Sequence, residues 1–101
     1  MLKNINFENG IIVYNDLVIN VNESLDNQFE NLKEDLLQVS YEDKLIIDVG
    51  WFPSFSKNGS FRVVVIKDYD WEKPIYRNAC RSVEELIKHL EESVSVVKSN
   101  L

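Results

Sequence analysis

Three acidic residues alternate along the segment DYDWEKP at positions 68–74, namely Asp68, Asp70 and Glu72. Carboxylates at alternate loop positions are the oxygen ligands that hard cations such as Ca²⁺ prefer. The glycine that an EF-hand loop needs at its sixth position is absent, because Lys73 stands there. We therefore interpret the segment as a solvated acidic loop and predict no metal site and no cofactor.

Cys80 and His89 are the only cysteine and the only histidine. A cysteine nucleophile needs a base within hydrogen-bonding reach. The pattern around His89 places it on the outer face of a helix, between Glu85 and Glu92 and about 120° from the apolar stripe. We therefore predict a structural cysteine and a surface histidine.

A second possible chemistry is general acid–base catalysis by paired carboxylates, such as Asp48 with Asp68 or Asp70. One carboxyl of such a pair must be buried with a raised pKa. The predicted strands place Asp48 and Asp68 at opposite ends of neighbouring strands. The sequence also contains no glycine-rich phosphate loop, C-x-x-C pair or G-x-S-x-G motif. We predict no catalytic residues and no enzymatic activity, and keep a small carboxylate enzyme as the weaker alternative.

The length and composition of the chain limit the class of protein that it can be. A length of 101 residues with 45% hydrophobic and 28% charged residues predicts one globular domain over 1–101. The opening residues MLKNINFENG do not resemble an export signal, and the longest apolar runs are four or five residues, so we expect neither export nor a membrane span. One cysteine cannot form an internal disulfide, which favours a reducing, cytoplasmic location.

The net charge is −6. Residues 1–50 carry ten acidic residues against three lysines, and residues 51–101 carry seven against eight basic residues. Nucleic acid and anionic lipid both require a basic face, so we expect neither as a direct partner. The balance favours a basic protein partner.

The elements that position these residues follow from hydrophobic spacing. Two mainly apolar runs, 11–14 and 17–21, flank Asn15-Asp16 and predict a β-hairpin. From Ser24, a helix cap, the spacing changes to fours and threes and predicts an amphipathic helix with these apolar residues: Leu25, Phe29, Leu32, Leu36 and Val39.

A period-two pattern predicts a strand over 44–50, and a run that is apolar on both faces predicts a central strand over 61–67. The turn pair Asn58-Gly59 predicts that the two pair antiparallel, and a weaker strand is predicted over 75–79. Ser82 and Glu85 form a capping box that starts a second helix, expected to fray after Val97. The order β-β-α-β-β-β-α predicts an α+β fold. Its mostly antiparallel sheet has about five strands, with the two amphipathic helices on one face.

This meander brings the connection before the strand at 45 to the same end of the sheet as the loop at 68–74. The result is an acidic surface with aromatic side chains among the carboxylates, to which Glu34 and Asp35 of the first helix could add. Complementary charge guides a cationic partner and desolvated aromatic side chains supply affinity. The predicted partner-binding residues are Tyr41, Glu42, Asp43, Asp68, Tyr69, Asp70, Trp71 and Glu72.

The loop at 51–60 is also rich in aromatic residues, with Trp51, Phe52 and Phe55. Large aromatic side chains are enriched at protein interfaces, and they also close the open ends of small cores. Both interpretations stand at this point.

Several segments resemble small immunity proteins of bacterial polymorphic toxin and contact-dependent growth inhibition systems. They are DVGWFP at 48–53, GSFRVVV at 59–65, DWEKP at 70–74 and the helix start at 82–86. The resemblance implies that the chain binds and neutralises the C-terminal toxin domain of a cognate effector, often a basic nuclease, by covering its active or substrate-binding surface. It carries over no fixed set of functional residues. The alternative is a non-enzymatic adaptor, monomeric or homodimeric through an exposed strand edge or the loop at 51–60.

Overall fold

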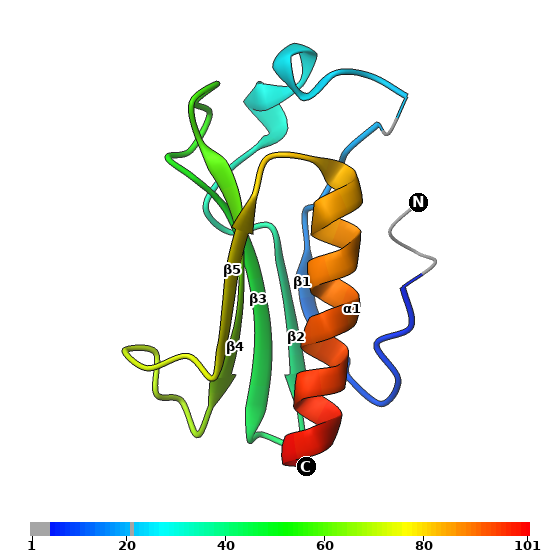
Figure 1. The fold of residues 1–101 in the computed structure, drawn as a ribbon, viewed down its shortest axis with the longest axis vertical. Helices are drawn as coiled ribbons and strands as arrows, with labels where there is room; N and C mark the ends of the chain where they lie inside the picture. Colours follow the sequence, from blue (N-terminus) through cyan, green and yellow to red (C-terminus); the bar gives the residue numbers. More distant parts are fainter. Residues whose placement is uncertain (1–4, 21) are drawn as a thin grey trace.

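The computed structural model describes residues 5–20 and 22–101. Its centre is a five-stranded antiparallel sheet in the order β1-β2-β3-β4-β5, with one long helix on one face (Figure 1). The strands are β1 (Ile11–Asn15), β2 (Leu37–Tyr41), β3 (Leu45–Phe52), β4 (Ser60–Lys67) and β5 (Tyr76–Cys80). The helix α1 (Val83–Asn100) runs antiparallel to β5 along the sheet. No described helix is long and apolar enough to cross a membrane.

The C-terminal elements follow the sequence pattern. β3 and β4 pair antiparallel along their whole length, from Leu45 opposite Lys67 to Phe52 opposite Ser60, and β5 continues the meander. Ser82 caps α1, since its hydroxyl accepts a hydrogen bond from the Glu85 amide at 3.1 Å. The Glu85 carboxylate accepts from the Ser82 hydroxyl at 3.0 Å, where a full capping box would use the Ser82 amide. The predicted fraying after Val97 is wrong, because α1 continues to Asn100.

The N-terminal predictions are wrong in both elements. Residues 11–15 form a strand, but they pair with β2 and not with residues 17–20, which contain no strand; Val21 lies outside the described residues. The helix predicted from Ser24 to Val39 is absent. Its place is taken by two 3-10 turns, η2 (Leu25–Asn27) and η3 (Phe29–Asn31), followed by β2. The fold therefore has one helix on the sheet where two were predicted.

A buried glutamine, Gln28, helps to hold the segment that contains η2 and η3 in turns. The Gln28 side-chain nitrogen donates to the carbonyl of Asn20 at 2.8 Å and to that of Glu23 at 3.2 Å. The Gln28 side-chain oxygen accepts from the Asn20 amide at 2.9 Å. These bonds tie Gln28 back to the backbone that precedes the 3-10 turns, and so favour a compact turn over one continuous helix. The apolar residues of the predicted helix still face the core, although no helix carries them.

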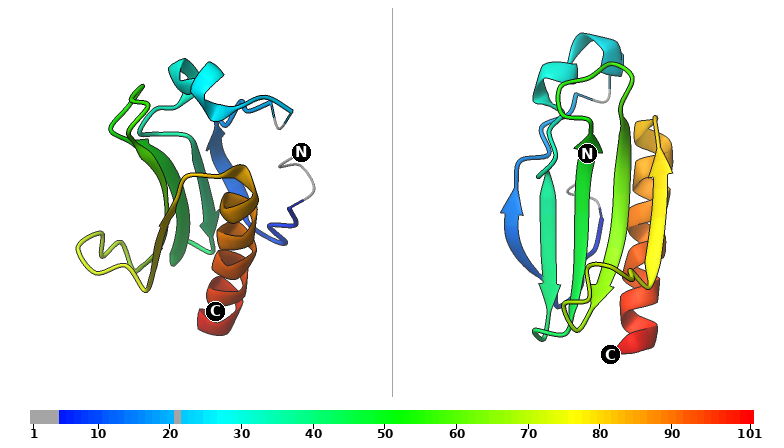
Figure 2. Two further views of the ribbon diagram at one scale, coloured as in Figure 1. Left: turned by 45° about the horizontal axis from the view of Figure 1, so that its top comes forward. Right: turned by 90° about the vertical axis from the view of Figure 1, so that its left-hand side faces the viewer.

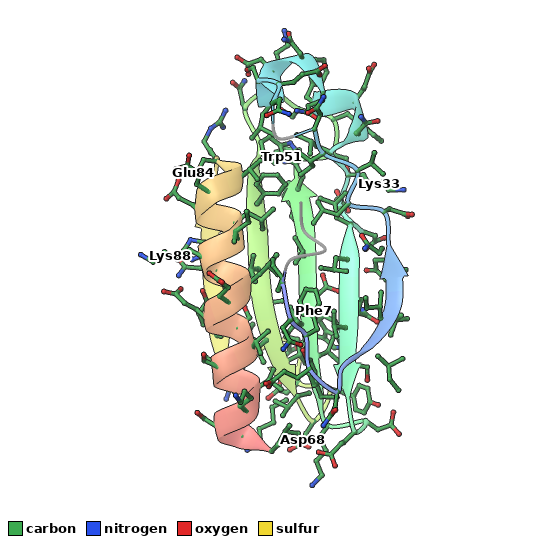
Figure 3. The ribbon with its side chains drawn as sticks, turned by 90° about the vertical axis from the view of Figure 1, so that its right-hand side faces the viewer. Phe7, Lys33, Trp51, Asp68, Glu84 and Lys88 are labelled. Carbon is green, nitrogen blue, oxygen red and sulfur yellow. The ribbon has the colours of Figure 1, made fainter. Side chains whose placement is uncertain are left out.

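The core lies between the sheet and α1. On this face the side chains of β2, β3 and β4 are buried, including Val39, Ile47 and Val63, except for Lys67 at the end of β4. α1 covers the part over β4 and β5, and residues near Phe7 cover the part over β2 (Figure 3). Trp51 and Phe61 pack edge to face, with ring centres 4.9 Å apart. Trp51 thus belongs to the core, which favours the core interpretation for that residue.

Two tight turns lie at the same end of the sheet. Glu42 and Asp43, between β2 and β3, have positive φ angles of 52° and 55°. Asp68 and Tyr69, after β4, have φ angles of 53° and 61°. The Asp68 amide donates to the carbonyl of Lys44 at 2.8 Å, which joins the two turns directly.

Candidate functional site

The predicted acidic end is assembled in part. The two joined turns bring Glu42, Asp43 and Asp68 to one end of the sheet, and the loop between β4 and β5 continues from there. This loop projects to the side of the sheet away from α1 (Figure 1; Figure 2, left). Its aromatic residues Tyr69 and Trp71 are 59% and 48% exposed. The end therefore presents carboxylates and aromatic side chains together.

Tyr41 does not join the exposed set. Its side chain is buried on the α1 side of the sheet, where Gly10 packs directly on Val39 and Tyr41. A Cβ at Gly10 would lie 2.6 Å from the Tyr41 ring, so this approach requires a glycine. Burial, and then the charge of Glu8, raises the pKa of the Tyr41 hydroxyl to about 12.

Glu34 and Asp35 lie at the opposite end of the sheet from the acidic turns. The residue before them, Lys33, accepts a backbone hydrogen bond from Trp51 at 2.8 Å, and the Glu34 amide donates to Ser54 at 3.0 Å. Because the predicted helix is absent, these two residues precede β2 and do not extend the acidic end.

Three lysines moderate the charge of the acidic end. The two turns and the loop hold five carboxylates, and Lys44, Lys67 and Lys73 lie in the same segments. The local excess is therefore two negative charges. The last turn of α1, whose free carbonyls add partial negative charge, lies at the same end. Charge alone is therefore a weak feature of this end, and the exposed aromatic residues are its other distinguishing feature.

The open face of the sheet, opposite α1, carries a groove that the sequence did not predict. Its volume is about 310 Å³. Phe52, Val64, Ile66, Trp71 and Pro74 supply its apolar lining, and its charged lining is Asp48, Arg62, Glu72 and Arg77. Trp71 and Glu72 belong to the predicted site, so the acidic loop forms one wall of the groove.

Strand register explains how the charged residues reach the groove. Residues opposite one another across a sheet share a face, and Gln38, Asp48, Val64 and Arg77 form one row across β2 to β5. Arg62 lies on the same face of β4, with its guanidinium 4.7 Å from the centre of the Phe52 ring. Among the described residues, neither Arg62 nor Arg77 forms an ion pair. Both guanidinium groups are available to a ligand.

Asp48 is the half-buried charged group of this row. Burial raises the pKa of its carboxyl, while the hydrogen bond that it accepts from Gln38 at 3.0 Å acts in the opposite direction. Asp68 lies four residues beyond the partner of Asp48 on β4, which is about 13 Å along the strand. Asp48 was predicted at the end of its strand and lies in the middle of β3. The two carboxylates, Asp48 and Asp68, are nevertheless too far apart to act as a pair. The carboxylate that shares the groove with it is Glu72.

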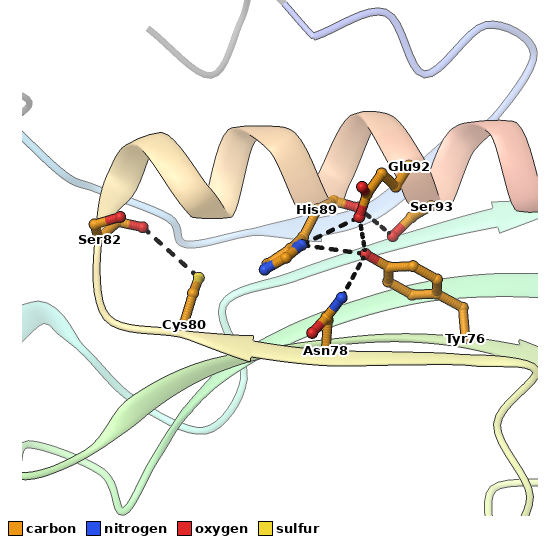
Figure 4. Close-up of polar contacts among 7 residues, drawn as sticks. All are labelled: Tyr76, Asn78, Cys80, Ser82, His89, Glu92 and Ser93. Carbon is orange, nitrogen blue, oxygen red and sulfur yellow. Dashed lines mark hydrogen bonds and ion pairs between the residues drawn. The ribbon is translucent and has the colours of Figure 1, made fainter.

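The prediction that His89 is a surface residue is wrong. Its side chain is 12% exposed and lies under β5, with its Nδ1 3.2 Å from the Glu92 carboxylate and 3.3 Å from the Tyr76 hydroxyl (Figure 4). The Tyr76 hydroxyl donates to Glu92 at 2.8 Å. His89 lies outside the apolar stripe of α1, but α1 packs on β5, and β5 covers His89. Hydrogen bonds from Tyr76, and then from His89, lower the pKa of Glu92.

Cys80 is buried at the end of β5. Burial raises the pKa of its thiol to about 11, so the unreactive protonated form predominates at neutral pH. Its sulfur lies 3.7 Å from the carbonyl of Ser82 (Figure 4). Over residues 5–20 and 22–101, no cluster of His, Cys, Asp and Glu side chains has the arrangement of a metal site.

Comparison with known proteins identified no relative of this chain. No protein-family model, curated protein or solved structure matches this chain.

Proposed function

We propose that this protein is a non-catalytic binding protein that holds a basic protein partner against the loop between β4 and β5 and the adjoining groove. The exposed Trp71 supports this proposal most directly. It lies between acidic residues on a projecting loop and also lines the groove. Large aromatic side chains at the centre of an interface supply much of its binding energy, and surrounding carboxylates select a cationic surface.

We further propose that the partner is a toxin domain and that the chain acts as its immunity protein in the cytoplasm. The resemblance of the segments 48–53, 59–65 and 70–74 to such proteins supports this role, and all three segments contribute residues to the groove. Inhibition then follows from covering the active or substrate-binding surface of the toxin. A basic nuclease is the toxin class that fits the net charge of −6.

The first experiment is neutralisation. The C-terminal domain encoded by the gene immediately upstream is expressed in cells with and without this protein, and binding of the two purified proteins is measured by calorimetry. We expect killing in its absence, rescue in its presence and a complex of one partner domain per chain. Binding without rescue would refute the immunity role and leave the binding role intact.

The second experiment locates the surface. Trp71→Ala should weaken binding by about 30-fold, which corresponds to about 2 kcal/mol. Phe55→Ala is the matched control, because Phe55 is similarly exposed but lies in the loop at the other end of the sheet. If Phe55→Ala weakens binding and Trp71→Ala does not, the interface is the 51–60 loop.

The third experiment tests charge. Asp70→Lys with Glu72→Lys should weaken binding strongly at low salt and much less at high salt, because exposed charges are screened over about 10 Å at 0.1 M. Glu30→Lys with Glu91→Lys makes the same change in net charge at exposed positions away from the loop and should have little effect. Equal effects of the two double variants would show that net charge, and not the acidic end, attracts the partner.

The groove also favours a second candidate function. Asp48, with its raised pKa, and Glu72 line the same groove beside two arginines, which is a composition suited to acid–base chemistry on an anionic substrate. If the protein acts only by binding, Asp48→Asn should change neutralisation only as far as it changes partner binding, because Asp48 lines the groove that holds the partner. Loss of neutralisation with binding retained would favour the catalytic role.

A further inference from the structure

The outer edge of β1 is the most apolar exposed part of the sheet. Ile11, Ile12 and Val13 are 68%, 50% and 55% exposed and follow one another in the chain. β1 is an edge strand, and alternate backbone N–H and C=O groups of an edge strand point away from its neighbour. The edge therefore offers both hydrogen-bonding groups and apolar side chains to another strand.

Edge strands usually carry features that prevent such pairing, among them lysine, proline, covering segments and bulges. Residues 11–15 contain neither a charged residue nor a proline, and the register with β2 shows a single bulge between Ile12 and Tyr14. The opposite edge differs. β5 presents Arg77 and Asn78, and Tyr76 beside them is bonded to Glu92 of α1. Of the two edges of the described sheet, β1 is therefore the one better suited to pairing.

Charge favours a second copy of the chain as the occupant. The chain as a whole carries −6, so two copies repel each other unless they meet where charge is absent. β1 is uncharged, and it lies at the opposite edge of the sheet from the strand that follows the acidic loop. A basic partner would gain nothing from a neutral edge. An edge strand that pairs antiparallel with its own copy needs only a two-fold axis, the commonest symmetry of protein dimers.

We propose that the protein forms a homodimer in which the β1 strands of two copies pair antiparallel and join the sheets into one of ten strands. The two β4–β5 loops then lie at the outer edges of the joined sheet. Each loop and groove stays accessible, so the dimer can hold two partner molecules. The dimer does not depend on the identity of that partner.

The test is the mass of the purified chain in solution by sedimentation over a range of concentrations. We expect a mass that rises with concentration from 11.8 kDa towards twice that value. Ile11→Lys with Val13→Lys should weaken dimerisation by more than about tenfold, since two charges would have to be buried beside the paired strands. Ile11→Thr with Val13→Thr removes apolar surface but keeps the β-branched shape that favours a strand. If this variant also weakens dimerisation, the cause is the loss of apolar contact between copies and not the unfolding of β1.

Ile75→Lys is the matched control, because Ile75 is also an exposed apolar residue but precedes β5 at the other edge. It should leave the mass unchanged. A single-chain mass at every concentration up to about 1 mM, where association would be worth only about 4 kcal/mol, overturns the proposal. So does a dimer that both β1 double variants leave intact while they keep the native circular dichroism.

Discussion

The two faces of the sheet are made by the same strands but have opposite chemistry. On the α1 side, Val39, Ile47 and Val63 are fully buried among apolar neighbours. On the open side, the residues adjacent to them in sequence include Asp48 and Arg62, which line a groove together with the acidic loop. Since side chains alternate between faces along a strand, β3 and β4 form the core with one set of side chains and contribute to the groove with the other. Ile46 and Ile66 on the open face are nevertheless buried.

The sharpest test of this division is a pair of identical substitutions at adjacent positions of β4. Val63→Ala, on the α1 side, should lower the free energy of unfolding by about 2 to 3 kcal/mol, because it opens a cavity in a closed core. Val64→Ala, on the half-exposed open face, should cost less than about 1 kcal/mol. Urea unfolding of both variants measures the difference. Equal losses would mean that the groove side is as tightly packed as the core.

A smaller loss of stability is expected from a change at the start of α1, the helix that covers one face of the sheet and leaves the other open. Ser82→Ala removes the side-chain acceptor of the Glu85 amide and should cost about 1 kcal/mol. Ser95→Ala, at an exposed position within the same helix, should be neutral or slightly stabilising, because alanine is the better helix former. Thermal unfolding followed by circular dichroism compares them. A Ser95→Ala loss as large as that of Ser82→Ala would argue against the cap.

The smallest effect concerns the buried charge of the open face. Burial raises the pKa of Asp48 above its value in the unfolded chain, so ionisation of this carboxyl costs stability as the pH rises through the raised pKa. Asp48→Asn should therefore raise the melting temperature by about 1 to 3 °C at pH 7. The gain should vanish below pH ~4, where the Asp48 carboxyl is protonated and therefore as neutral as the asparagine that replaces it. A gain that persists unchanged in acid would have a cause other than charge.

The C-terminal half was predictable because its signals are local. The alternation in 44–50, the apolar run at 61–67, and the serine and glutamate that start α1 each specify one structure within a few residues. The residues from Leu25 to Val39 have helical spacing too, but the hydrogen bonds of Gln28 favour turns, and residues 37–41 pair with β3. β1 finds its partner β2 more than 20 residues later along the chain, a pairing that no local pattern specifies.

The candidate site divides in the same way. Convergence of Glu42, Asp43 and Asp68 followed from the meander alone, since alternate turns of a meander share one end. The groove did not follow, because the sequence does not say which face α1 covers. One signal was present: Asp48 and Arg62 interrupt strands that are otherwise almost wholly apolar, and both fall on the same face once the register is known.

The left-handed backbone of the two joined turns has a consequence for how this sequence can change over generations. Glycine and asparagine adopt positive φ angles most readily, yet the four turn positions hold Glu42, Asp43, Asp68 and Tyr69. A population of variants selected for stability alone should therefore accumulate glycine and asparagine at these positions. A population selected for partner binding should keep acidic and aromatic residues there, so comparing the two populations separates the demands of folding from those of recognition.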